Sequence, residues 1–259
     1  MPETSVAMMR RILIIHNPTA GKQRTKLLDG VVAALRLRGL APEVVTTEHP
    51  EHATELALSA DADLVVAAGG DGTINEVVHG LMTRDGARPA FATLPLGTIN
   101  VLALELGLPP DVIGLAGVLA DGPLMPVTVG RANGRHFLLT AGAGVDAAAV
   151  KVLSPGLKKM FGQAAYYIAL VSALFIEGNT VFDIKIDGGM RRVSSVIVTN
   201  AARYAGDKVV APNAHLSVHD LHVLIGLRHG RWNLMRYGVA YMRGVLPYLP
   251  DVQIVSMQR

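Results

Sequence analysis

Asp71 stands among three glycines directly after an apolar run, in the stretch DLVVAAGGDGTINEVVHG at residues 63–80. Glycine lets backbone N–H groups approach an anion closely, and a helix that begins at the same point adds its positive end. The stretch therefore predicts a phosphate-binding loop. Because phosphates would repel a carboxylate, we interpret Asp71 as a residue that meets Mg²⁺ or receives a proton.

Two further loops of this kind follow apolar runs in the first half of the chain. NPTAGK, at residues 17–22, comes after RILIIH, and PLGT, at residues 95–98, comes after AFATL and is followed by Asn100. If the apolar runs are parallel strands, their carboxyl ends lie at one edge of a sheet. We expect the three loops to gather there and to bind a polyphosphate.

Other interpretations of these motifs were weighed against phosphate binding. Thr73 and Glu76 have the spacing of a capping box, whose role is to start a helix at Ile74. The AGK in the first loop is not a Walker A motif, because His16 and Gln23 occupy the positions that require Gly and Ser or Thr. GAGVDA, at residues 142–147, matches a dinucleotide-binding pattern, but the acid expected about 20 residues later is missing, which disfavours NAD.

The elements that must position the loops alternate in type along the first half. Strands are predicted at residues 11–16, 43–47, 63–68 and 90–94, and helices at 23–37, 51–59, 74–82, 99–106 and 112–119. Fully apolar strands joined by helical crossovers indicate an α/β fold, with a parallel sheet covered on both faces.

The pattern of predicted elements changes at about Gly122. Strand-like runs now follow one another, at residues 127–141, 181–186, 191–201, 214–226 and 251–257, with helical insertions at 157–175 and 232–246. Turn residues punctuate these runs. We therefore predict two domains, residues 9–122 with a parallel sheet and residues 123–259 with mainly antiparallel strands.

Composition narrows the class of protein. Half of the 259 residues are apolar, which allows a sizeable core, and the absence of cysteine excludes a disulfide scaffold or a thiolate metal site. The net charge of +3 is too diffuse to indicate nucleic-acid binding. The apolar run at residues 164–176 is shorter than the roughly 20 residues of a membrane-spanning helix. Residues 1–10 lack the apolar core of a secretory signal, so a cytoplasmic location is expected.

With these motifs, the chain resembles the diacylglycerol kinase catalytic-domain family of lipid kinases, which includes bacterial diacylglycerol, sphingosine and ceramide kinases. The motifs that carry the resemblance are NPTAGK, GGDGTINEV, PLGTINVLALELGLP, GAGVDA, KKMFGQAAYYIA and TNAARYAGDKVVAPNA. It implies an N-terminal nucleotide-binding domain, a C-terminal β-sandwich-like domain, and transfer of the ATP γ-phosphoryl group to a lipid hydroxyl between them, with Mg²⁺.

The resemblance also implies roles for particular residues. Asp71 matches the essential acid and a metal ligand, and Asp146 matches a position that faces the lipid head group. On the substrate side, Lys158 or Lys159 could reach phosphates across the cleft, although both lysines also fit a solvated helix start. Asp220 is the nearest candidate for a second metal-linked acid. The implied nucleotide-binding residues are Asn17, Lys22, Gly69, Gly70, Gly72, Thr73, Glu76, Gly97, Thr98 and Asn100.

Two departures from the family pattern keep other functions open. Where relatives have an acidic turn, this chain reads HLSVHDLHV, so the acid position falls on Ser217 or Val218, and the sequence stops soon after residue 257. The alternatives are a catalytically degenerate nucleotide-binding protein and an NAD kinase, which shares the GGDGT motif. The sequence does not select the lipid acceptor, and it leaves a homodimer open.

Two segments combine cations with aromatic residues and suggest peripheral contact with a membrane. One is the helix predicted from Leu157, which contains Lys158 and Lys159. The other begins at Arg228 and contains Arg231, Arg236 and Arg243 together with Trp232, Tyr237 and Tyr241. The alternative is that these aromatic residues belong to the core and that the arginines are merely solvated.

Overall fold

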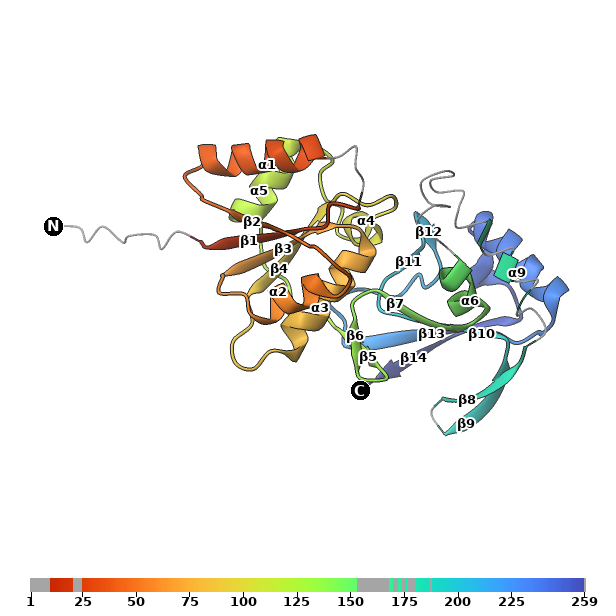
Figure 1. Ribbon diagram of the computed structural model, residues 1–259. Helices are drawn as coiled ribbons and strands as arrows, with labels where there is room; N and C mark the ends of the chain where they lie inside the picture. Colours follow the sequence, from red (N-terminus) through yellow and green to blue (C-terminus); the bar gives the residue numbers. More distant parts are fainter. Residues whose placement is uncertain are drawn as a thin grey trace. The chain divides into compact units, whose positions relative to one another are not determined.

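The computed structural model describes residues 10–20, 25–152, 168–169, 172–173, 176, 180–186 and 188–258. The chain divides into two compact units, residues 1–125 and residues 126–259. The division falls a few residues after the boundary predicted at Gly122. Figure 1 shows the elements of both units.

Unit 1 contains a four-stranded parallel sheet in the order β2-β1-β3-β4. Its strands are β1 (Ile12–His16), β2 (Glu43–Thr46), β3 (Leu64–Gly69) and β4 (Ala90–Pro95). Every residue of β3 is buried, which explains why the run carries no polar side chain. The prediction of an α/β fold is confirmed.

Among the described residues of this unit, five helices accompany the sheet: α1 (Thr25–Leu37), α2 (His52–Leu58), α3 (Asp71–Thr83), α4 (Val101–Glu105) and α5 (Val112–Asp121). Helices α1 and α5 pack together on one face of the sheet, and α2 and α3 pack together on the other (Figure 1). The core beneath α1 and α5 includes Ile14, Val66 and Leu94. The covered sheet places the loops after its strands at one edge.

Helix α3 begins earlier than the sequence predicts. Its first residue is Asp71 rather than Ile74, and Gly70 occupies the N-cap position without a side-chain hydrogen bond. Thr73 therefore lies inside the first turn, so the capping-box interpretation of Thr73 and Glu76 is wrong. The start of the helix is displaced toward the glycines, and its first N–H groups lie among them.

Unit 2 contains a four-stranded antiparallel sheet in the order β14-β13-β10-β7. Its strands are β7 (Thr140–Gly144), β10 (Ser195–Thr199), β13 (Asp220–Gly226) and β14 (Val252–Gln258). The described residues of the unit also form three short ribbons: β5 (Gly130–Ala132) with β6 (Arg135–Phe137), β8 (Phe182–Ile186) with β9 (Gly189–Val193), and β11 (Arg203–Tyr204) with β12 (Lys208–Val209). The mainly antiparallel prediction is confirmed.

The two faces of this sheet are covered by different elements. Ile197, Leu224 and Ile254 face each other in register and pack with α6 (Val145–Val152) and α9 (Arg231–Met242). The alternate residues of β10 and β13, such as Val196 and Ile225, pack against the β8–β9 ribbon. The β8–β9 ribbon covers one face of the four-stranded sheet, as the second layer of the predicted sandwich, and helices α6 and α9 cover the other face.

Several predicted elements of unit 2 have different bounds. The run at residues 191–201 is interrupted at Ser194 and supplies strands to two sheets, because its halves pack on different neighbours. The run at 214–226 becomes a strand only at residue 220. Helix α9 ends at Met242, since Gly244 adopts a φ of 70°, and a short helix η1 (Leu246–Tyr248) follows. Most of the helix predicted at 157–175 lies outside the described residues.

No helix in the described part of the chain combines the length and the hydropathy needed to cross a bilayer.

Candidate active site

The loops after β3 and β4 touch each other at glycine residues. The N–H groups of Leu96 and Gly97 both donate to the carbonyl oxygen of Gly69, over 3.0 and 3.1 Å. A Cβ added to Gly97 would lie 2.5 Å from the Cα of Gly70, closer than real Cβ atoms come. Only glycine permits this approach, so these two loops form one continuous edge.

The loop after β1 joins the same edge through Asn17. Its backbone N–H donates to the carbonyl oxygen of Ala68 over 3.0 Å, and its Nδ2 donates to the Thr73 hydroxyl over 3.0 Å. Its Oδ1 accepts from the N–H and the hydroxyl of Thr19. The Asn17 side chain therefore links the first loop to the first turn of α3. We call the loops after β1, β3 and β4, together with that turn, the glycine edge.

Asp71 connects the starts of two helices within the glycine edge. It is the first residue of α3, and its Oδ2 accepts from the N–H of Val101, the first residue of α4, over 3.3 Å. Its Oδ1 is buried. The positive end of α3 stabilises a carboxylate at this position. Asn100, in a left-handed conformation with φ 57°, donates its Nδ2 to the Gly97 carbonyl over 2.8 Å and so fixes the turn before α4.

The glycine edge leaves room for an anion at the start of α3. Gly72 is exposed, and a Cβ added to it would meet no atom within 4 Å. The first N–H groups of a helix have no intrahelical acceptor, and Gly70 provides no side-chain cap. Thr98 is also exposed at this edge. Helical N–H groups beside open space fit a phosphate, and the adjacent carboxylate of Asp71 is the residue that would hold a Mg²⁺ ion, which would neutralise phosphate charge.

This arrangement does not test the roles predicted for two further nucleotide-binding residues. Glu76 lies in the second turn of α3, where its backbone carbonyl accepts from the Thr54 hydroxyl of α2 over 3.0 Å. Lys22 lies outside the described residues. The roles predicted for Glu76 and Lys22 stay predictions.

A fourth loop, which the sequence analysis passed over because it has no glycine, follows β2 at the same edge. Its Thr47 N–H donates to the His16 carbonyl over 2.8 Å. The rings of His49 and His52 stack with centroids 4.6 Å apart, and Glu55 could complete a metal-binding group with them. However, the Nδ1 of His52 accepts the backbone N–H of Glu48 over 3.0 Å, which suits a loop-shaping role.

Asp146 is the buried carboxylate of unit 2. It is 9% exposed in the first turn of α6, and its Oδ1 accepts from the hydroxyl of Tyr204. Burial raises the pKa of Asp146, and the hydrogen bond from Tyr204 opposes this rise. The Tyr241 hydroxyl donates to the Tyr204 carbonyl over 2.8 Å, which holds the tyrosine in place.

The same carboxylate explains the glycine pattern of GAGVDA. A Cβ added to Gly142 would lie 1.5 Å from Asp146 Oδ2, so the side chain folds back over this glycine. The strand concerned, β7, is an edge strand of an antiparallel sheet, whereas a dinucleotide fold needs a parallel β-α-β unit. The match to a dinucleotide-binding pattern therefore reflects packing.

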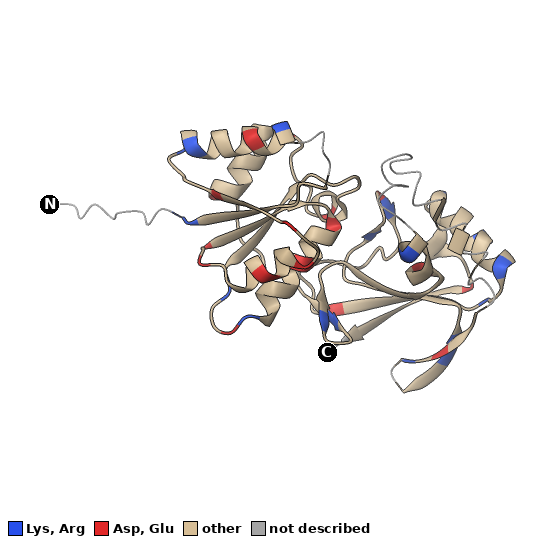
Figure 2. Cartoon of the chain, in the orientation of Figure 1, with Lys and Arg blue, Asp and Glu red and all other residues tan. Residues whose placement is uncertain are grey.

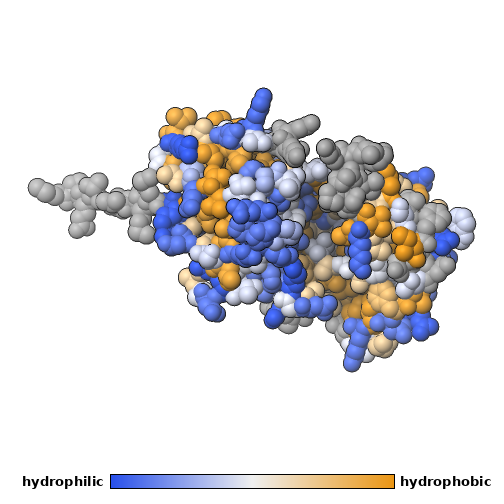
Figure 3. Space-filling view, viewed as in Figure 1, coloured by the Kyte–Doolittle hydropathy of each residue, from blue (hydrophilic) through white to orange (hydrophobic). Residues whose placement is uncertain are grey.

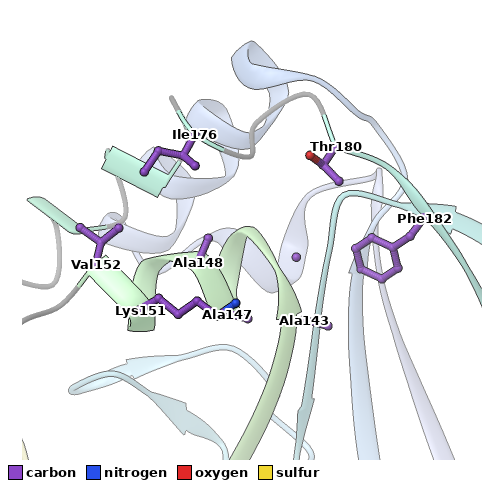
Figure 4. A pocket seen from close by; sticks show the side chains of 9 residues that line it. Ala143, Ala147, Ala148, Lys151, Val152, Ile176, Thr180 and Phe182 are labelled. Carbon is purple, nitrogen blue, oxygen red and sulfur yellow. The ribbon is translucent and has the colours of Figure 1, made fainter.

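A pocket of about 440 Å³ lies beside α6 (Figure 4). The alkyl stem of Lys151 runs along the helix toward Ala147, and Phe182 of β8 stands at the other side. Apart from Lys151 and Thr180, the lining is apolar. The lining residues are Ala143, Gly144, Ala147, Ala148, Lys151, Val152, Ile176, Thr180 and Phe182.

The remaining predicted site residues also belong to unit 2. Asp220 begins β13, and its Oδ2 accepts from the Ser256 hydroxyl over 3.0 Å. Its assignment as a metal ligand stays a prediction. Lys158 and Lys159 lie outside the described residues.

Comparison with known proteins supports the kinase interpretation. Residues 11–132 match the diacylglycerol kinase catalytic domain. The chain is 34% identical to a diacylglycerol kinase of Bacillus subtilis over 225 residues, which are 83% of this chain and 74% of the relative. It is 39% identical to a diacylglycerol kinase of Staphylococcus epidermidis over 166 residues, which are 62% of this chain and 52% of the relative.

Solved structures show the same fold. A diacylglycerol kinase from Bacillus anthracis superposes with a TM-score of 0.69 at 23% identity, covering 96% of this chain and 84% of that chain. A second structure from the same organism superposes with a TM-score of 0.77 at 24% identity, covering 99% of this chain and 85% of that chain.

Proposed function

Because this chain belongs to the diacylglycerol kinase catalytic-domain family, we propose that it transfers the γ-phosphoryl group of ATP to the hydroxyl group of a lipid such as diacylglycerol. The observation that carries the proposal is the glycine edge, where open space at the start of α3 adjoins the carboxylate of Asp71. The named relatives support a diacylglycerol-like acceptor.

In this proposal the backbone of the glycine edge holds the phosphates of ATP. The N–H groups of Gly72 and Thr73, in the first turn of α3, would donate to these phosphates, and Gly97 lets the neighbouring loop approach. Asn17 keeps the first loop against α3. Mg²⁺, when bound by Asp71, would neutralise charge on the phosphate oxygens. Most of the acceleration would come from positioning and charge neutralisation.

Asp71 is also the proposed acceptor of the lipid hydroxyl proton. Phosphoryl transfer passes through a loose transition state, so the proton leaves late and the carboxylate needs no raised pKa. The hydrogen bond from Val101 holds the carboxylate in one orientation, and the positive end of α3 lies beside it. A carboxylate fixed in this way suits the task.

Unit 2 would receive the lipid. The pocket beside α6 has an apolar lining of a size suited to part of an acyl chain, and the buried Asp146 on the same helix offers a carboxylate for the polar head. A lipid alcohol joins these two chemistries, apolar chain and hydroxyl, in one molecule. This supports a lipid acceptor over a dinucleotide.

The test is incubation of the protein with γ-labelled ATP, Mg²⁺ and a mixed lipid extract, followed by identification of the labelled product. Diacylglycerol, a sphingoid base, ceramide and NAD are then supplied singly. We expect label in a lipid, with diacylglycerol preferred, and none in the Asp71→Asn variant. Label in NAD would contradict the lipid assignment, and ATP binding without label in any acceptor would indicate a noncatalytic protein.

A further inference from the structure

Helix α9 has one buried and one exposed face. Its buried face consists of Leu234, Tyr237, Ala240 and Tyr241, which lie in the core with the antiparallel sheet. The sequence interpretation that Tyr237 and Tyr241 contact a membrane is therefore wrong. The exposed positions follow the complementary helical period, and the side chain of Trp232 at the start of the helix is 80% exposed.

The exposed face carries apolar side chains along its length. Val239 and Met242 are exposed at seven and ten residues after Trp232, which places all three on one side of the helix. Tyr248, in the following helix η1, is 71% exposed. Apolar side chains so exposed in a row indicate an interaction surface. We call Trp232, Val239, Met242, Arg243 and Tyr248 the α9 surface.

Positive charge surrounds these apolar residues. Residues 228–248 contain four arginines, at 228, 231, 236 and 243, and no aspartate or glutamate. Figure 2 shows no acidic residue on α9, and Figure 3 shows hydrophobic and hydrophilic atoms side by side on the part of unit 2 that is in view. The segment is therefore both cationic and apolar.

The first acidic residue that follows the segment in the sequence is engaged by its side chains. Asp251 forms ion pairs with Arg236 and, over 3.5 Å, with Arg228, and it accepts from the Tyr237 hydroxyl over 2.8 Å. Burial acts to raise the pKa of Asp251, but hydrogen bonds from Tyr237 and Arg236 outweigh it and lower the pKa. Asp251 thus anchors α9 as a carboxylate. No ion pair joins Arg243 to another described residue.

We propose that the α9 surface binds the face of an anionic phospholipid bilayer. Tryptophan and tyrosine favour the boundary between headgroups and acyl chains, and arginines beside them are attracted to anionic headgroups. The absence of acidic residues on the segment favours a negatively charged partner surface. The inference rests on the proposed function, because a lipid acceptor has to be reached in a membrane.

Trp232 provides a direct test, because it is the only tryptophan in the chain. The protein is mixed with vesicles of phosphatidylcholine, alone or with phosphatidylglycerol, and neither ATP nor diacylglycerol is added. We expect tryptophan emission to move to shorter wavelength with the anionic vesicles only. Brominated acyl chains should quench it, and salt should reverse both effects.

Variants then distinguish binding through the α9 surface from a general effect of the protein's positive charge. Co-sedimentation with the anionic vesicles should weaken about fivefold in Arg243→Gln, since each arginine near the surface contributes about that factor. Trp232→Ala should weaken it further by removing the inserted ring. Arg131→Gln, an equal loss of charge at an exposed position of β5, is the matched control and should change nothing.

Two outcomes would overturn the inference. One is an unchanged Trp232 emission while the protein sediments with the vesicles, which would assign binding to another surface. The other is an absence of binding to anionic vesicles at low salt. Because these vesicles contain no acceptor and no ATP, either result leaves the kinase assay unaffected, and a failed kinase assay leaves the vesicle result unaffected.

Discussion

Two strand-to-helix junctions in this protein combine glycines with one aspartate, yet they are built differently. At the junction of β3 and α3, Asp71 opens the helix and Gly72 faces open space. At the junction of β7 and α6, Asp146 folds back over Gly142 and fills the space above it. The first junction leaves helical N–H groups for a ligand, and the second uses its glycine for packing.

The comparison shows that a glycine pattern alone does not identify a binding loop. The position of the carboxylate relative to the glycine differs between the two junctions. Asp71 precedes Gly72 and leaves the start of α3 accessible, whereas Asp146 follows Gly142 and its side chain covers that glycine. The sheets differ accordingly, since β3 is a central parallel strand and β7 is an antiparallel edge strand. The two junctions should therefore respond differently when their glycines are substituted.

The largest effect is expected for Asp71→Asn. Loss of the proton acceptor and metal ligand should lower kcat with diacylglycerol by at least about a hundredfold, within the range of general-base catalysis. The fold should remain, because the amide keeps the shape of the side chain, and thermal unfolding by circular dichroism should shift only slightly. Asp85→Asn, an exposed acid in the loop after α3, is the matched control. Full turnover by Asp71→Asn would exclude Asp71 from the mechanism.

Next is Gly142→Ala, which tests the packed junction. The added methyl group meets the Asp146 carboxylate, so the free energy of unfolding should fall by about 3 kcal/mol, which is at the upper end of the cost of overpacking a core. Urea unfolding measures this change. An unchanged midpoint would show that Asp146 can move away from Gly142 without cost.

Gly72→Ala tests the open junction and should have the opposite effect on stability. The methyl group meets no atom, and alanine favours the helix by up to about 1 kcal/mol. It occupies the space assigned to phosphate, so ATP affinity measured by calorimetry should fall about tenfold, the loss of roughly one charge-assisted hydrogen bond. Unaltered ATP affinity would place the phosphates elsewhere.

The smallest effect is expected for Tyr204→Phe and depends on pH. Burial raises the pKa of Asp146, so the native state holds a proton that the unfolded state releases, and this group's contribution to stability falls as pH rises above the ordinary aspartate pKa of 3.8. The Tyr204 hydroxyl opposes the shift. Its removal should cost about 1 kcal/mol at neutral pH and less at pH 3, below the ordinary aspartate pKa of 3.8, where the raised pKa leaves Asp146 protonated. Unfolding curves at the two pH values check this, and an equal loss at both would contradict it.

The sequence predicted the first unit well because its signals are local. Apolar runs such as β3 have their length and position set by burial on both faces, and Asn17, Gly70 and Gly97 stand where parallel strands end. The start of α3 was misplaced, because the capping-box spacing of Thr73 competes with a helix start that needs no side-chain cap.

The second unit was harder to predict because its arrangement depends on distant contacts. The side chain of Asp146 lies over Gly142 and accepts a hydrogen bond from the hydroxyl of Tyr204, 58 residues later in the chain. The run at residues 191–201 contains no glycine or proline that would mark a break at Ser194, so only its packing partners reveal that it serves two sheets. In α9, aromatic residues occur on both faces, and only the sheet beneath selects Tyr237 for the core and leaves Trp232 exposed.

The most direct test of the central claim, that the glycine edge holds the phosphates of ATP, is an amide-resolved NMR titration with ATP and Mg²⁺. The account predicts that the largest shifts occur at Gly70, Gly72, Thr73, Gly97 and Thr98. Largest shifts in the GAGVDA segment of unit 2, or saturable ATP binding that leaves the amides of the glycine edge unmoved, would contradict it.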